Sequence, residues 1–161
     1  MPSHLCLKKP STVSFHEASF AALGGIALEA LRLAKPEIGH RVAVIGLGLL
    51  GQITAQALKA SGCKVIGVDV LEDRLNLAQE LSCDAVFNSG ESDLAAEAIR
   101  FSRGHGLDSV IILASTKSDE PLRQAASMCM ERGTIVASGL VGLNVPRDLF
   151  FEKELNLVIP K

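Results

Sequence analysis

The stretch from Arg41 to Ser61 constrains the fold more than any other part of this sequence. A short apolar segment, 41–45, leads into three glycines with the spacing G-x-G-x-x-G, namely Gly46, Gly48 and Gly51. Apolar residues then recur at helical spacing. This succession predicts a strand, a tight turn and a helix.

Each of the three glycines has its own role in such a turn. Gly46 permits the sharp turn, Gly48 lets a pyrophosphate approach the backbone, and Gly51 lets the helix pack close to the strand. The N-terminus of the helix then offers N–H groups and the positive end of its dipole to phosphate. Because glycine-rich turns are common, the motif alone is a weak signal, and its context decides.

A second strand, Val65–Asp69, supplies that context. Its last residue is an acid 23 residues after Gly46, close to the spacing of a carboxylate that binds the adenosine ribose. The alternative is a solvated acid at a strand end that caps the next helix. Because a 2′-phosphate would meet Asp69, with Glu72 and Asp73 close behind, we expect NAD to be preferred over NADP.

Composition excludes several other classes of protein. The 161 residues suit one domain, and the apolar residues are aliphatic, with no Trp or Tyr, as in strands covered by helices on both faces. A net charge of −2 argues against a nucleic-acid surface. The four cysteines form no C-x-x-C pair, so we expect reduced thiols rather than a metal site or disulfides. No apolar run approaches the ~18 residues of a membrane span, and no signal peptide is apparent, so we expect a cytoplasmic protein.

The rest of the chain alternates helices and strands. Residues 1–12 are expected to form a tail or leader and residues 13–161 one NAD(P)-binding domain. Ser14–Glu17 has capping-box spacing and predicts a helix towards Leu23, which Gly24–Gly25 should break before a second helix over 26–34. Later helices are expected over 71–82, from 91 or 92 to 101, and from Ser118 as N-cap to a stop at Gly133. Further strands are expected over 85–87, 107–113, 134–137 and 154–159.

This alternation predicts an α/β fold, a doubly wound parallel sheet with helices on both faces. Six strands give the order 3-2-1-4-5-6, with the ligand over the carboxyl ends of the first and fourth strands.

With the strands placed, the chain from about Val13 to Lys161 resembles the coenzyme-binding (Rossmann) domain of the medium-chain, zinc-type alcohol dehydrogenases. The segments that carry the resemblance are 13–20, 39–51, 65–69, 106–115 and 133–140. Segments 43–51 and 145–155 look most like the threonine-dehydrogenase-like, two-part branch of that family.

The resemblance implies an NAD cofactor and a set of residues around it. Leu50 would face the nicotinamide, with core packing as the alternative, and Arg74 would lie beside the adenosine ribose, with a plain surface arginine as the alternative. Ser115 is not expected to be a nucleophile, because no histidine is placed to serve it. The implied cofactor-binding residues are Gly46, Gly48, Leu49, Leu50, Gly51, Asp69, Val70, Arg74, Ala114, Ser115, Gly139 and Leu140.

The departures from the family concern catalysis. Its members carry a separate catalytic domain with zinc ligands, and neither the Cys/His constellation nor the four-cysteine loop is present here. Many relatives also place a threonine facing the nicotinamide where this chain has Gly24–Gly25. We therefore expect no catalytic or metal-binding residue in this chain. We interpret it as a piece of a longer enzyme that transfers hydride between a hydroxyl carbon and nicotinamide, with a natural truncation as the alternative.

Two other functions were weighed. A stand-alone regulatory module that senses the dinucleotide is the alternative, whereas a short-chain enzyme would need a Tyr-x-x-x-Lys pair, which a chain without Tyr excludes. The expected partners are the dinucleotide, the missing catalytic domain, and a second copy that pairs through the edge strand 154–159, as in the resembled family.

Overall fold

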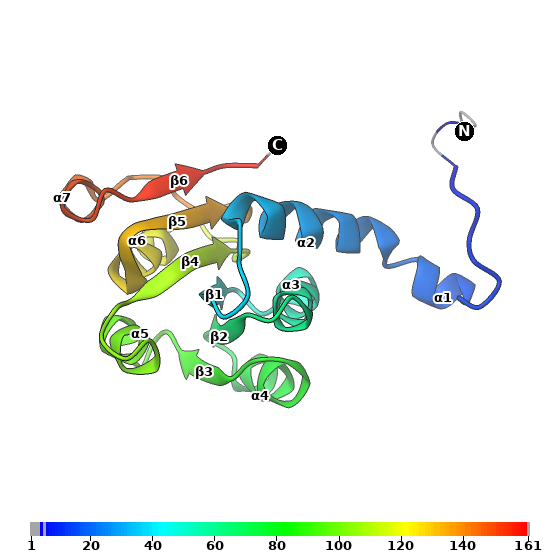
Figure 1. The fold of residues 1–161 in the computed structure, drawn as a ribbon, viewed down its shortest axis with the longest axis horizontal. Coiled ribbons are helices and arrows are strands. Elements are labelled where there is room, and N and C mark those ends of the chain that lie inside the picture. Colours follow the sequence, from blue (N-terminus) through cyan, green and yellow to red (C-terminus); the bar gives the residue numbers. More distant parts are fainter. Residues whose placement is uncertain (1–3, 5, 161) are drawn as a thin grey trace.

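A six-stranded, all-parallel sheet forms the centre of the computed structural model, which describes residue 4 and residues 6–160. The strand order is β3-β2-β1-β4-β5-β6 and helices cover both faces (Figure 1), which confirms the predicted fold class and order. The strands are β1 (Arg41–Ile45), β2 (Lys64–Asp69), β3 (Ala85–Asn88), β4 (Leu107–Ile112), β5 (Cys129–Ala137) and β6 (Asn156–Val158). The helices are α1 (Phe15–Ala18), α2 (Ala21–Ala34), α3 (Leu49–Ala60), α4 (Glu72–Leu81), α5 (Leu94–Phe101), α6 (Glu120–Met128) and α7 (Arg147–Glu152).

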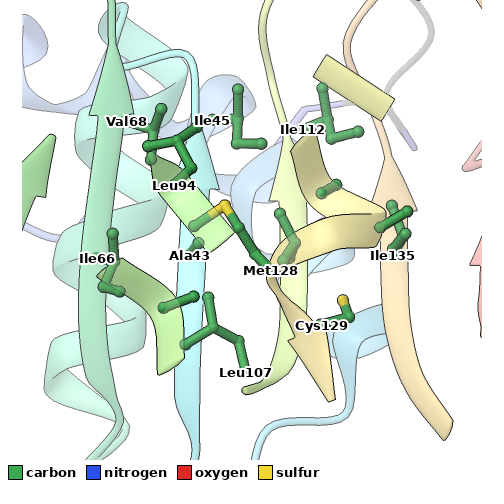
Figure 2. Packing of buried hydrophobic residues seen from close by; sticks show 14 of the residues in the cluster. Ala43, Ile45, Ile66, Val68, Leu94, Leu107, Ile112, Met128, Cys129 and Ile135 are labelled. Carbon is green, nitrogen blue, oxygen red and sulfur yellow. The ribbon is translucent and has the colours of Figure 1, made fainter. Parts of the chain in front are cut away.

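Two apolar clusters lie on opposite faces of the sheet, because successive side chains of a strand point to opposite sides. From β1, Val42 and Val44 pack with α2, α3 and α4, whereas Ala43 and Ile45 pack with α5 and α6. Figure 2 shows the second cluster, with Leu94 of α5 and Met128 of α6 lying over the strands. Burial on both faces explains why the strands read as nearly continuous apolar runs.

The register places the candidate site. β1 pairs with β2 on one side and β4 on the other, so that Ile45 lies opposite both Val68 and Ile112. The chain therefore leaves all three strands at the same edge, and the strand order reverses between β1 and β4. This reversal is where open parallel sheets bind ligands.

The predicted break at Gly24–Gly25 is wrong. The capping box at Ser14 is present, with its Oγ accepting a hydrogen bond from Glu17 N–H at 3.1 Å, but α1 ends at Ala18 and α2 continues through both glycines. Glycine costs about 1 kcal/mol in a helix interior relative to alanine. Burial of one alanine face of α2 overrides that cost, since helices in proteins depend mainly on tertiary packing.

The predicted stop of α6 at Gly133 is also wrong. α6 ends at Met128 and β5 begins at once with Cys129. The Lys153 ammonium donates hydrogen bonds to the carbonyl oxygens of Ala126, Ser127 and Cys129 at 3.0, 2.8 and 2.7 Å, and so satisfies the end of the helix. Gly133 instead lies within β5.

Smaller differences concern the ends of elements. Asp93 rather than Ser92 or Glu91 is the N-cap of α5, and Asp119 rather than Ser118 is the N-cap of α6. β6 is shorter than the predicted strand, and α7 was not predicted. Within the described residues, no helix combines the length and apolar character needed to cross a membrane.

Candidate functional site

Two glycines of the turn lie in positions that exclude any larger residue. Gly46 has φ +96°, and a Cβ there would lie 2.5 Å from the backbone nitrogen of Ala114. A Cβ on Gly51 would lie 2.0 Å from the carbonyl oxygen of Gly46. Absence of side chains at these two positions therefore brings β1, β4 and α3 into backbone contact.

Gly48 differs from the other two. A Cβ there would have no heavy atom within 4 Å, so the backbone at this position borders open space. Gly48 is also the N-cap of α3, and no side chain caps that helix. An uncapped N-terminus presents N–H groups and the positive end of the helix dipole, an arrangement that suits an anion.

Asp69, at the end of β2, is held by backbone N–H groups. Its side chain is buried, with the residue 6% exposed. Oδ2 accepts a hydrogen bond from Leu47 N–H at 2.7 Å, and Oδ1 accepts from Val70 N–H at 2.8 Å and Leu71 N–H at 3.1 Å. The carboxylate therefore fixes the glycine turn, and it is not the solvated acid that the alternative interpretation describes.

Arg74 lies over the same carboxylate. Its guanidinium is 3.4 Å from Asp69 Oδ2, and its side chain is about half exposed. The contact therefore joins a half-exposed guanidinium to a buried carboxylate. That Arg74 lies beside the adenosine ribose stays a prediction.

Gln52 is a buried residue of this region that sequence reasoning missed. Its amide nitrogen donates to the carbonyl oxygens of Leu47 at 3.1 Å and Arg74 at 2.9 Å, which connects the glycine turn to α4. Its Oε1 has no hydrogen-bond partner among the described residues. The available signal was a polar residue directly after the third glycine, on a helix that is otherwise apolar there.

One cleft of about 560 Å³ lies above the carboxyl ends of β1, β2 and β4, and Gly46, Gly48, Asp69 and Arg74 border it. Seven of the predicted cofactor-binding residues line it: Gly46, Gly48, Asp69, Val70, Arg74, Ala114 and Ser115. Thr116, which was predicted at the crevice with Ala114 and Ser115, also lines the cleft. Residues that were not predicted complete the lining: Ile45, Val68, Ser89, Leu113, Ser118, Glu120, Pro121 and Gln124.

Five predicted residues lie outside this lining. Gly51 is buried beneath the turn, Leu50 is half-buried, and Leu49 is 56% exposed at the start of α3. Gly139 packs on the backbone of Ala114, where a Cβ would lie 2.1 Å from the carbonyl oxygen. Leu140 is 82% exposed in the segment after β5.

Comparison of this sequence with known protein families gives the class of protein to which the chain belongs. Residues 50–158 match the model of a family described as zinc-binding dehydrogenase, and the chain belongs to that family. The resemblance to zinc-type alcohol dehydrogenases and the predicted identity, the dinucleotide-binding domain of a zinc-type dehydrogenase, are thereby confirmed. The finer match to the threonine-dehydrogenase-like branch stays a prediction.

Individual relatives give the extent of the similarity. The chain is 30% identical over 141 residues to a zinc-type alcohol dehydrogenase-like protein of Escherichia coli and 31% identical over 145 residues to an alcohol dehydrogenase of Geobacillus stearothermophilus. These matches cover 87% and 89% of this chain but 40% and 42% of the relatives. A solved oxidoreductase of unknown specificity from Escherichia coli superposes with a TM-score of 0.90 at 26% identity, over 99% of this chain and 46% of the other. The chain thus spans less than half the length of these proteins.

Proposed function

We propose that this chain binds NAD(H) in the cleft. The adenosine ribose would lie on Asp69, the pyrophosphate beside Gly48 at the N-terminus of α3, and the nicotinamide towards the ends of β4 and β5. The observation that carries the proposal is a buried carboxylate, fixed by three backbone N–H groups, that borders the same cleft as an uncapped helix N-terminus. The bound nicotinamide supplies hydride-transfer chemistry.

Asp69 also supports the choice of NAD over NADP. A 2′-phosphate at ~4 Å from this carboxylate would be repelled by on the order of 4 kcal/mol at an effective dielectric constant near 20. Glu72 and Asp73 lie in the first turn of α4 and add negative charge on the same side. Arg74 is the nearest cation, and its ion pair with Asp69 limits its use for a phosphate.

Asp69→Asn tests this proposal. The amide keeps the shape of the side chain and one oxygen acceptor for the turn, but it removes the charge. We expect titration calorimetry to show that wild type prefers NADH over NADPH. In the variant this preference should fall by up to about a thousandfold, the equivalent of a repulsion of about 4 kcal/mol. Glu80→Gln, an exposed acid of α4, is the matched control and should leave the ratio unchanged. Equal affinity of wild type for the two cofactors would overturn the proposal.

The cofactor-binding domain is proposed to serve a larger enzyme. In that enzyme hydride would pass between a hydroxyl carbon of the substrate and the nicotinamide, with the substrate held by the catalytic domain that the relatives carry outside the matched region. We place the enzyme in the cytoplasm, because Cys63, Cys83 and Cys129 are buried thiols. Burial raises the pKa of Cys83 to about 11 and that of Cys129 to about 12, which keeps both thiols protonated and unreactive.

A homodimer through β6 is proposed on the basis of the sheet edge. β6 pairs with β5 on one side only, and its three residues are followed by Ile159, which is 58% exposed. An apolar edge of this kind is a template for pairing with a second copy across a two-fold axis. Leu157 belongs to the rim of the apolar cluster, so a proline there would also disturb the core.

Ile159→Lys is therefore a cleaner test of the dimer. Two-fold pairing would bring the new charges of both copies close together, so light scattering should show a dimer for wild type and a monomer for the variant. Leu77→Lys places the same charge on exposed α4 and should remain dimeric. A wild type that is monomeric at high concentration, or a dimeric Ile159→Lys, contradicts pairing through this edge.

A further inference from the structure

The two segments that leave the sheet after β4 and β5 are bound to each other beyond the ends of the strands. Gly139 N–H donates to Ile112 C=O at 2.7 Å, Thr116 N–H donates to Leu140 C=O at 2.9 Å, and Gly142 N–H donates to Ser118 C=O at 3.0 Å. The first segment is a wall of the cleft, whereas the second carries Gly139 and Leu140. Each segment therefore depends on the other for its position.

Asp119 adds the one side-chain hydrogen bond between these two segments within the described residues. As the N-cap of α6 it is expected to cap its own helix, but its side chain makes no capping bond there. Its Oδ1 instead accepts a hydrogen bond from Asn144 N–H at 2.9 Å, across 25 residues of sequence. The capping function passes to Ser118, whose Oγ accepts from Glu120 N–H at 3.1 Å.

The backbone of Gly142 also lies close to the Asp119 carboxylate. A Cβ on Gly142 would lie 2.2 Å from Asp119 Oδ1 and 3.0 Å from the backbone nitrogen of Asp119. The backbone of the second segment thus approaches Asp119 closely on both sides of Leu143. A half-buried carboxylate that is diverted from its own helix thus holds the segment 139–144 against the cleft wall.

The position of Asp119 bears on the nicotinamide half of the cofactor. In a doubly wound sheet the dinucleotide lies across the crevice, with each half of the sheet receiving one mononucleotide. Asp69 assigns the adenosine half to β1 and β2, so the ends of β4 and β5 are left for the nicotinamide half. Asp119 follows β4, and its contacts with Asn144 and Gly142 belong to the segment after β5, on the side of this second half.

We propose that Asp119 is a positioning residue for the nicotinamide end of the cleft. By holding Asn144 and Gly142 it fixes the Gly139–Leu140 backbone, and so it sets the affinity for the nicotinamide while leaving the adenosine half unaffected. This inference rests on the proposed binding of NAD(H).

The test compares two ligands that differ only in the nicotinamide, namely NADH and ADP-ribose. Asp119→Ala should weaken NADH binding about fivefold, the effect of one net hydrogen bond, and change ADP-ribose binding less than about twofold. Asp119→Asn keeps an oxygen that can accept from Asn144 N–H and should restore NADH affinity. Asp148→Ala, an exposed acid of α7, is the matched control and should match wild type for both ligands.

A second variant approaches the same contact from the other side. Gly142→Ala should weaken NADH binding selectively, because its methyl group displaces the Asp119 carboxylate. In the Asp119→Ala background that obstacle is gone, so the second substitution should add less than about twofold. Thermal melting of each variant verifies that the domain is folded.

The possible outcomes separate the two proposals. If wild type binds neither ligand, the proposed NAD(H) site is wrong. If wild type binds both but Asp119→Ala weakens the two equally, or weakens neither, the positioning role of Asp119 is wrong. Independent, additive effects of the two substitutions would also contradict it.

Discussion

Alanine substitutions at two glycines of the turn should have opposite consequences, although the residues are three positions apart. A Cβ on Gly51 would lie 2.0 Å from the carbonyl oxygen of Gly46, more than 1 Å inside ordinary van der Waals contact, which begins near 3.4 Å. That carbonyl cannot yield easily, because Gly46 N–H is bonded to Val68 C=O at 2.8 Å. Gly51→Ala must therefore displace α3 from β1.

The magnitudes of the two effects follow from the same geometry. Overpacking of a core lowers the free energy of unfolding by about 1–3 kcal/mol. We expect the upper value, about 3 kcal/mol, for Gly51→Ala, because the added methyl group meets backbone rather than a movable side chain. In a domain of this size each kcal/mol lowers Tm by about 2–4 °C, so Gly51→Ala should lower Tm by about 6–12 °C. Gly48→Ala meets no atom and has φ −64°, so its Tm should change by less than about 3 °C.

For cofactor binding the order of the two variants should be reversed. Relative to the stability that each variant loses, Gly48→Ala should lose more NADH affinity than Gly51→Ala. The methyl group of Gly48→Ala occupies the space proposed for the pyrophosphate, so NADH affinity should fall about tenfold or more in a fully folded protein. Differential scanning calorimetry and NADH titration measure the two quantities. A Gly51→Ala variant that melts like wild type would refute the packing argument, and a Gly48→Ala variant that binds normally would refute the placement of the phosphates.

Two further predictions concern stability. Lys153→Met should lower the free energy of unfolding by about 2–3 kcal/mol, because three carbonyl oxygens at the end of α6 lose their donor. Lys153→Arg should retain most of the wild-type stability. Chemical denaturation measures both variants, and a Met variant as stable as wild type would show that these hydrogen bonds do not stabilise the end of α6. Burial alone would raise the pKa of Asp84, but hydrogen bonds from Lys59 at 2.6 Å and Val65 N–H at 2.8 Å outweigh it, so the pKa is lowered. Because the pKa of Asp84 is lower in the folded state than the value near 4 in the unfolded chain, its carboxylate stabilises the fold above about pH 4, and this stabilisation is lost as pH falls through the folded-state pKa. Asp84→Asn should therefore have a lower Tm than wild type at pH 7, and the difference in Tm should shrink below about pH 4. A difference in Tm that is independent of pH would contradict this prediction.

The sequence specified those features whose causes are local. A run such as Val42–Ile45 must be a strand, and the glycine spacing with Asp69 defines a turn and an acid within one βαβ unit. These patterns sufficed for the strand order and for the side of the cleft formed by β1 and β2.

The features that were missed depend on contacts between distant residues. α6 ends at Met128 because of Lys153, and no pattern near residue 128 reports that lysine. Gln52 binds the carbonyls of Leu47 and Arg74 only after α3 and α4 have packed together. The part of the cleft wall formed by Ser118 has no motif, because loops are fixed by the partners they meet in the folded chain.

The sheet divides the apolar interior into two compartments, with consequences for how mutations combine. Leu58 of α3 lies in one cluster and Leu122 of α6 in the other, and among residue 4 and residues 6–160 no buried residue belongs to both clusters. Energetic coupling between substitutions requires shared neighbours, so losses on the two faces should simply add. The two faces can therefore vary largely independently, and a loss of stability on one face can be offset by an additive gain on the other.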